Sequence, residues 1–160
     1  MLVRPLVLTI RQSRVVVSLL IKADSEGRHF SVVVLEVRPD AEGAKAAKVY
    51  ADAGIPTTVV LDSVVGYVVE RADLMVVGAE AVVDNGVVFN KMENYTMGIV
   101  ARDIGKPFYV AADSYKFGRL FPMNQLDLND MGPESRLIFV DTAIWEVMGV
   151  FVGTPPLPCD

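Results

Sequence analysis

The side chains that most often bind metal or act as nucleophiles are scarce in this sequence. It contains one cysteine, Cys159, and one histidine, His29. A single cysteine can form neither an intrachain disulfide nor a cysteine metal cluster, so a reducing cytosolic setting is the natural interpretation. With so few ligands, a histidine-based catalytic triad or a zinc site would need implausible geometry. We therefore expect no metal site.

Long apolar runs, basic clusters and nucleotide-binding motifs are also absent. No apolar stretch approaches the ~18–20 residues needed to cross a bilayer, and residues 1–5 lack the pattern of a secretory signal. The formal net charge is −5 and the basic residues are dispersed, which argues against a nucleic-acid-binding or membrane-binding surface. Neither G-x-G-x-x-G nor G-x-x-x-x-G-K-[ST] occurs, so we expect no nucleotide cofactor.

The sequence does contain enough apolar material for one full core. Its 160 residues are 52% hydrophobic and 22% charged, which is typical of a single globular domain. Short β-branched runs alternate with longer segments in which apolar residues recur at helical spacing. Strands are predicted over residues 6–10, 30–37, 57–61, 74–78, 107–112 and 137–140, and helices from Val15 to Ala23 and over 42–53, 62–71, 90–104 and 143–149.

This alternation predicts the fold. Successive parallel strands need crossover connections, so we expect one doubly wound α/β domain over residues 1–160, with a mainly parallel, Rossmann-like sheet and helices on both faces. Asp62-Ser63 should cap the third helix, and Asp84-Asn85-Gly86 should form a tight turn. The helix over 90–104 is inferred from an apolar face made of Met92, Tyr95, Thr96, Ile99 and Val100.

Polar residues follow the predicted strands. In doubly wound sheets the functional crevice lies outside the carboxyl ends of the strands, where the sequence places Arg11, Arg38, Asp62, Glu80 and Asp113. The alternative is that Asp62 and Asp113 only cap helices. Asn90-Lys91 opens a helix, and a lysine beside free helix N–H groups favours an anion such as phosphate. The alternative for Lys91 is an ordinary lysine in a first helical turn.

The segment from Tyr115 to Met123 is rich in aromatic residues and is predicted to lack regular structure. Aromatic and methionine clusters on loops are enriched at protein interfaces. We therefore regard Tyr115, Phe117, Phe121 and Met123 as candidate interface residues. The alternative is that these side chains only cover the edge of the sheet.

Segments at 8–16, 36–43, 53–86, 90–122 and 124–128 resemble, in order and at consistent spacing, the C-terminal domain of one protein family. That family comprises the alpha, beta and delta subunits of eukaryotic translation initiation factor 2B together with methylthioribose-1-phosphate and ribose-1,5-bisphosphate isomerases. VGAE (77–80), VVDNG (82–86) and SYKFGRLFPMNQ (114–125) make the alpha subunit the nearest resemblance. The family's N-terminal helical domain has no counterpart here, so we expect the chain to be a piece of a longer protein.

The resemblance also implies a changed active site. The isomerases use a cysteine after the first strand and an aspartate after the fourth, where this chain has Arg11 and Glu80. A guanidinium stays protonated and can act neither as base nor as nucleophile, and the extra methylene of Glu80 would misplace a catalytic carboxylate. Asn90, Lys91, Arg38 and Glu42 fall where the family lines its sugar-phosphate pocket, although Glu42 departs from the usual glutamine. The resemblance thus implies a site kept for binding a sugar phosphate or nucleotide.

The function implied by the resemblance is regulatory. We expect a non-catalytic, cytoplasmic subunit of the guanine-nucleotide exchange factor for translation initiation factor two. Its partners would be a second alpha subunit, the beta, gamma, delta and epsilon subunits, and the phosphorylated alpha subunit of the initiation factor. One alternative is an active sugar-phosphate aldose-ketose isomerase of the same family, and another is a domain of a beta or delta subunit.

Overall fold

The computed structural model of the chain describes residues 4–38, 41–83, 88–119 and 148–153. A six-stranded sheet runs through these residues, all neighbouring strands being parallel, in the order β3-β2-β1-β4-β7-β9. Its strands are β1 (Leu6–Ile10), β2 (Ser31–Glu36), β3 (Thr57–Leu61), β4 (Leu74–Gly78), β7 (Phe108–Asp113) and β9 (Met148–Gly153). A second sheet, ordered β6-β5-β8, is formed by β5 (Ala81–Val83), β6 (Val88–Phe89) and β8 (Phe117–Gly118).

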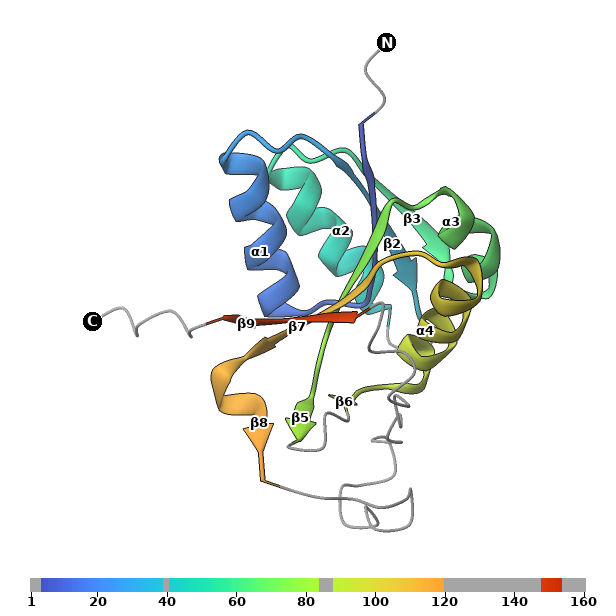
Figure 1. Ribbon diagram of the computed structural model, residues 1–160. Helices are drawn as coiled ribbons and strands as arrows, with labels where there is room; N and C mark the ends of the chain where they lie inside the picture. The colour runs from blue at the N-terminus through green and yellow to red at the C-terminus, as the bar shows by residue number, and fades with distance from the viewer. Residues whose placement is uncertain (1–3, 39–40, 84–87, 120–147, 154–160) are drawn as a thin grey trace, which may run out of the picture.

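Helices cover both faces of the main sheet (Figure 1). On one face lie α1 (Arg14–Ser25) and α2 (Glu42–Asp52), and on the other lie α3 (Val65–Arg71) and α4 (Met92–Ile104). Side chains alternate between the faces along each strand: Val7 of β1 packs with the α1–α2 layer, and Leu8 packs with the α3–α4 layer. Strands buried on both sides need apolar residues at nearly every position, as in β2. The predicted doubly wound α/β fold is confirmed.

The strand order reverses between β1 and β4. The chain winds outward from β1 through β2 to β3, then returns to the other side of β1 and continues through β4 to β7. At such a switch point the two neighbouring crossovers leave on opposite faces, which opens a crevice at the carboxyl ends of the strands. The small β6-β5-β8 sheet lies beyond the same ends, since β5 follows β4 and β8 follows β7 (Figure 1).

Most predicted elements form with small shifts at their ends. The strands over 6–10, 57–61 and 74–78 have the predicted bounds, while the helix predicted over 90–104 begins at Met92 and the strand over 107–112 runs from Phe108 to Asp113. The predicted turn at 84–86 and strand at 137–140 lie outside the described residues. None of the described helices is long and apolar enough to cross a bilayer.

Three predictions about local structure are wrong. Residues 148 and 149, expected in a helix, begin strand β9, because a continuous parallel register with β7 supplies their backbone partners from a distant part of the sequence. The segment after Asp113, expected to be irregular, forms a 3₁₀ helix (Ser114–Lys116) and β8, which pairs with β5. Neither the 3₁₀ helix at Asp62–Val64 nor α3 has a side-chain cap, so the predicted Asp62-Ser63 cap does not form.

Candidate functional site

A pocket of about 300 Å³ lies at the switch point, against the carboxyl ends of β1 and β4. Its walls come from the residues after β1, the first turn of α1, the first residue of α2, the start of α4 and the end of β7. The charge of the lining is mixed: the cations are Arg11, Arg14, Lys91 and Lys116, and the carboxylates are Glu42, Glu80 and Asp113. Such a lining can bind an anionic group and a hydroxyl-bearing group side by side.

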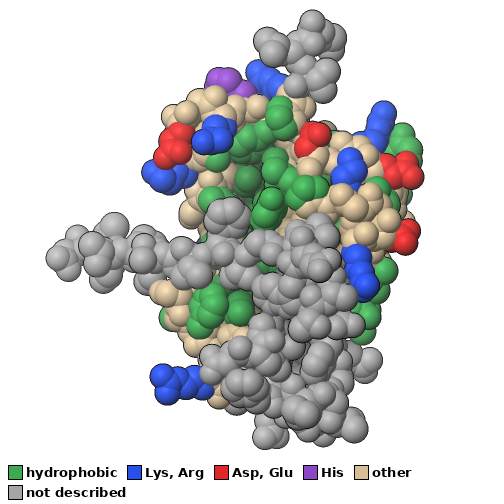
Figure 2. Space-filling model, in the orientation of Figure 1, with side chains coloured by type: hydrophobic (Ala, Val, Ile, Leu, Met, Phe, Trp, Pro, Cys, Tyr) green, Lys and Arg blue, Asp and Glu red, His purple; other side chains and the backbone are tan. Residues whose placement is uncertain are grey.

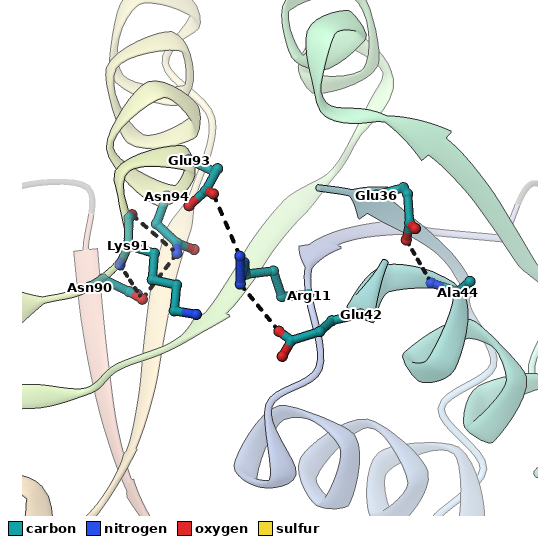
Figure 3. A network of polar contacts seen from close by, with 8 residues as sticks. All are labelled: Arg11, Glu36, Glu42, Ala44, Asn90, Lys91, Glu93 and Asn94. Atoms are coloured by element: carbon teal, nitrogen blue, oxygen red, sulfur yellow. Dashed lines mark hydrogen bonds and ion pairs between the residues drawn. The ribbon is translucent and has the colours of Figure 1, made fainter. Parts of the chain in front are cut away.

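Arg11 is the largely buried cation of this pocket. It follows β1 directly, and its side chain is only 10% exposed. Its Nη1 donates a hydrogen bond to Glu42 Oε2 at 3.2 Å, and its Nη2 lies 3.7 Å from Glu93 Oε1 (Figure 3). A buried guanidinium needs such partners because an uncompensated buried charge is strongly destabilising. The site where the family resemblance places a thiol is therefore filled by a fixed positive charge.

The backbone on both sides of the Arg11–Glu42 pair is left-handed. Arg11 has a φ of 56° and Ala41, just before Glu42, has a φ of 54°; they are the two non-glycine residues with positive φ in the described part of the chain. This conformation costs roughly 1–2 kcal/mol for a residue with a Cβ. Strain of this kind persists where the surrounding contacts enforce it, often at functional sites. Here the two left-handed residues lie where the carboxyl end of β1 meets the start of α2.

Asn90 organises the start of α4. Its Nδ2 donates to the carbonyl oxygen of Gly78 at the end of β4, and its Oδ1 accepts hydrogen bonds from Lys91 N and Asn94 Nδ2, both at 3.0 Å. These bonds occupy most of the amide, so Asn90 fixes the position of its neighbour more than it offers a free group to a ligand. The sequence predicted Asn90 as a binding residue; its contacts indicate a positioning role.

Lys91 is the cation best placed to meet a ligand. It lines the pocket, and its side chain extends from the start of α4 beside Arg11 (Figure 3). Helices α1 and α4 both begin at the pocket. No side chain caps α1 and no acidic residue stands in its first turn, so unpaired N–H groups and the helix dipole add positive potential there.

The structure brings five of the six predicted site residues around one pocket. Arg11, Glu42, Glu80, Asn90 and Lys91 line it; whether they bind a ligand stays a prediction. Arg38 is not among the lining residues: its side chain is 71% exposed, with Nε 3.7 Å from Glu36 Oε1. Among the described residues, no group of three His, Cys, Asp or Glu side chains could hold a metal ion.

Several residues of the site were not predicted from the sequence. Arg14 and Lys116 line the pocket, and the Lys116 amine donates to the carbonyl oxygen of Ala79. Tyr115, predicted at an interface, lines the pocket and is exposed. Phe117, also predicted at an interface, is exposed but is not among the lining residues. Phe121 and Met123 lie outside the described residues. Arg14 could have been found because it opens the helix after the first strand, whereas no local pattern marks Lys116 or Glu93.

A doubly wound sheet whose strand ends and helix N-termini meet at a polar pocket is the arrangement in which α/β domains bind small anionic ligands. The chain belongs to the initiation factor 2 subunit family, whose family model matches residues 4–151. The translation initiation factor eIF2B subunit alpha of Dictyostelium discoideum is 45% identical over 119 residues, which are 74% of this chain and 37% of that protein.

Isomerases also appear among the relatives. The ribose 1,5-bisphosphate isomerase of Methanocaldococcus jannaschii is 33% identical over 136 residues, which are 84% of this chain and 44% of that protein. The solved translation initiation factor eIF-2B of Pyrococcus horikoshii OT3 has a TM-score of 0.72 and 28% identity, over 77% of this chain and 45% of that one. The chain thus spans less than half the length of each of these three relatives.

Proposed function

We propose that the chain is part of an alpha-type regulatory subunit of the exchange factor for translation initiation factor two, non-catalytic and cytoplasmic. Similarity to eIF2B alpha subunits supports this assignment. The observation that carries the non-catalytic part is Arg11, whose side chain is 10% exposed and paired with Glu42, at the position where the resemblance places the cysteine of the family's isomerases. Because a guanidinium does not release its proton near neutral pH, it cannot start the isomerisation.

The pocket would bind a sugar phosphate or nucleotide without converting it. Lys91 and the start of α1 favour the phosphate, while Glu80 and Asp113 can accept hydrogen bonds from sugar hydroxyls. Binding there would bridge α1, α4 and the ends of the central strands. A ligand held in this way can tune how the domain assembles with its partners.

Calorimetric titration with ribose 5-phosphate and adenosine monophosphate tests the pocket. We expect binding by the wild type and at least a roughly tenfold weaker affinity for Lys91→Ala, because a charge-assisted hydrogen bond contributes about 1.5–3 kcal/mol. Lys48→Ala, which removes an exposed lysine of α2, is the control and should bind as the wild type does. If neither ribose 5-phosphate nor adenosine monophosphate gave a heat of binding, the proposed pocket would be contradicted.

The second candidate function is an active isomerase, which similarity to ribose 1,5-bisphosphate isomerases favours. Glu80 would then have to work without a thiol partner. An assay with ribose-1,5-bisphosphate and methylthioribose-1-phosphate separates the two functions. We expect no turnover above background; turnover that Glu80→Gln abolishes would establish the enzyme instead.

The proposed assembly is a homodimer of alpha subunits joined to beta, gamma, delta and epsilon subunits, and it would sense the phosphorylated alpha subunit of the initiation factor. Exposed Tyr115 and Phe117 support a contact surface next to the pocket. A pull-down against the separate subunits distinguishes an alpha-type chain, which should pair with itself, from a beta-type or delta-type chain, which should not.

A further inference from the structure

Glu42 and Glu93 both contact Arg11, but they hold it unequally. Glu42 Oε2 accepts a hydrogen bond from Nη1 at 3.2 Å. Glu93 Oε1 lies 3.7 Å from Nη2, beyond hydrogen-bond distance, so that contact rests on charge attraction alone. Glu42 therefore fixes the guanidinium, and Glu93 is the partner that can leave at smaller cost.

Glu93 is also poorly satisfied where it lies. Its side chain is 24% exposed, and its Oε2 is buried with no hydrogen-bond partner among the described residues. A buried carboxylate oxygen without a donor loses the hydration it would have in water. What favours the position is the charge of Arg11 and the N-terminus of α4, in whose first turn Glu93 stands.

The position of Glu93 bears directly on the anion pocket. Figure 3 shows Glu93 and Lys91 reaching toward Arg11 from the start of α4, while Glu42 approaches from α2 on the other side. Arg11 and Lys91 line the pocket and Glu93 does not, but an anion that bridges the two cations would approach the guanidinium from the α4 side, where Glu93 stands. There it meets the negative charge of Glu93, which repels it and already occupies Nη2.

We propose that Glu93 is an internal competitor for the anion of the ligand, an inference that rests on the proposed binding function. A phosphate ester enters by displacing the Glu93 carboxylate from Arg11 Nη2, while the Arg11–Glu42 hydrogen bond stays in place. Glu93 thereby weakens binding and sets the ligand concentration at which the pocket fills.

Titration of Glu93→Gln with inorganic phosphate and with ribose 5-phosphate tests the proposal. The substitution removes the charge and keeps the shape, so we expect about tenfold tighter binding of both anions. Glu70→Gln is the matched control because it makes the same substitution at an exposed glutamate of α3 that is not among the lining residues of the pocket; we expect less than a threefold change. Glu93→Asp, which shortens the side chain, should give an intermediate gain. Thermal unfolding of each variant confirms that it is folded.

The outcomes separate this proposal from the proposed function. If neither the wild type nor Glu93→Gln binds either anion, the binding function fails and the competitor role fails with it. If the wild type binds and Glu93→Gln binds equally or more weakly, the pocket stands and the competitor role is wrong. A gain in Glu70→Gln as large as in Glu93→Gln would also overturn it, because the effect would then follow from the lower net negative charge of the protein and not from the contact with Arg11.

Discussion

The residues around the first turn of α2 leave almost no free space. Glu36, at the end of β2, is 3% exposed, and its Oε2 accepts a hydrogen bond from Ala44 N at 2.7 Å. The turn lies so close that a Cβ on Gly43 would meet Glu36 Oε2 at 2.5 Å and the backbone oxygen of Leu35 at 2.8 Å. This close approach holds Glu42 at the mouth of the pocket. Glycine at position 43 is therefore required by contact distance.

Gly43→Ala should lower the free energy of unfolding by about 1–3 kcal/mol, because overpacking against a strand backbone forces the helix to shift. The matched control is Gly66→Ala in α3, where a new Cβ meets nothing within 4 Å; higher helix propensity should raise stability by up to about 1 kcal/mol. Urea unfolding of both variants measures the two effects. Equal stability of Gly43→Ala and the wild type would contradict the close packing.

At the scale of elements, α4 shows how an amphipathic pattern can mark a helix and still mislead about its buried face. The stripe of Met92, Tyr95 and Ile99, from which the helix was predicted, is exposed, and the buried face includes Met97 and Gly98. Gly98 faces the sheet, where an added Cβ would make ordinary van der Waals contact with Phe108 Cζ at 3.9 Å. Spacing predicted the helix, but the packing of α4 against the sheet and α3 determines which face is buried.

The packing of α2 makes a prediction about alkaline pH. Tyr50 is 1% exposed between α2 and the sheet, and burial raises the pKa of its phenol above the ordinary value of 10.0. The folded state therefore favours the neutral phenol. The contribution of Tyr50 to the free energy of unfolding is fully present below about pH 10, where the phenol begins to ionise in the unfolded chain. As the pH rises further, this contribution is lost by up to about 1.4 kcal/mol per pH unit.

Urea unfolding of the wild type and Tyr50→Phe at pH 8 and pH 11 measures this contribution. We expect the variant to lose less stability between the two pH values than the wild type does, by roughly 1 kcal/mol. Tyr67→Phe, which alters an exposed tyrosine of α3, is the control and should follow the wild type. Identical losses in all three proteins would show that Tyr50 does not ionise on unfolding in this range.

At the scale of the whole molecule, local sequence patterns predicted the strands and helices that form the layers. Contacts between residues distant in sequence determined which side chains meet at the site. Continuous apolar runs predicted strands such as Leu6–Ile10, and the rule for parallel sheets then brought Arg11 and Glu80 to one pocket. The same rule suggested Arg38, but β2 ends one strand away from the switch point, and that side chain lies near Glu36. The Arg11–Glu93 contact joins residues far apart in sequence, so no motif or periodic pattern in the sequence could have predicted it.

Assembly is the property that belongs to the whole molecule, and two of the exposed apolar surfaces of the described residues are candidates for the dimer contact. Phe117 is 45% exposed beside the pocket, in the segment where the sequence predicted an interface. Tyr95, 39% exposed, belongs to the outward stripe of α4. A glutamate buried in a dimer interface loses its hydration without a partner, so the variant at the true contact should dissociate.

The oligomeric mass of Phe117→Glu and Tyr95→Glu, measured by light scattering across a concentration series, decides between the surfaces. We expect the wild type and Tyr95→Glu to form dimers and Phe117→Glu to remain a folded monomer. Lys48→Glu adds the same residue at an exposed position of α2 and should leave the dimer intact. Dissociation of Tyr95→Glu alone would move the interface to α4, and a monomeric wild type would mean that pairing needs parts of the relatives' length that this chain does not span.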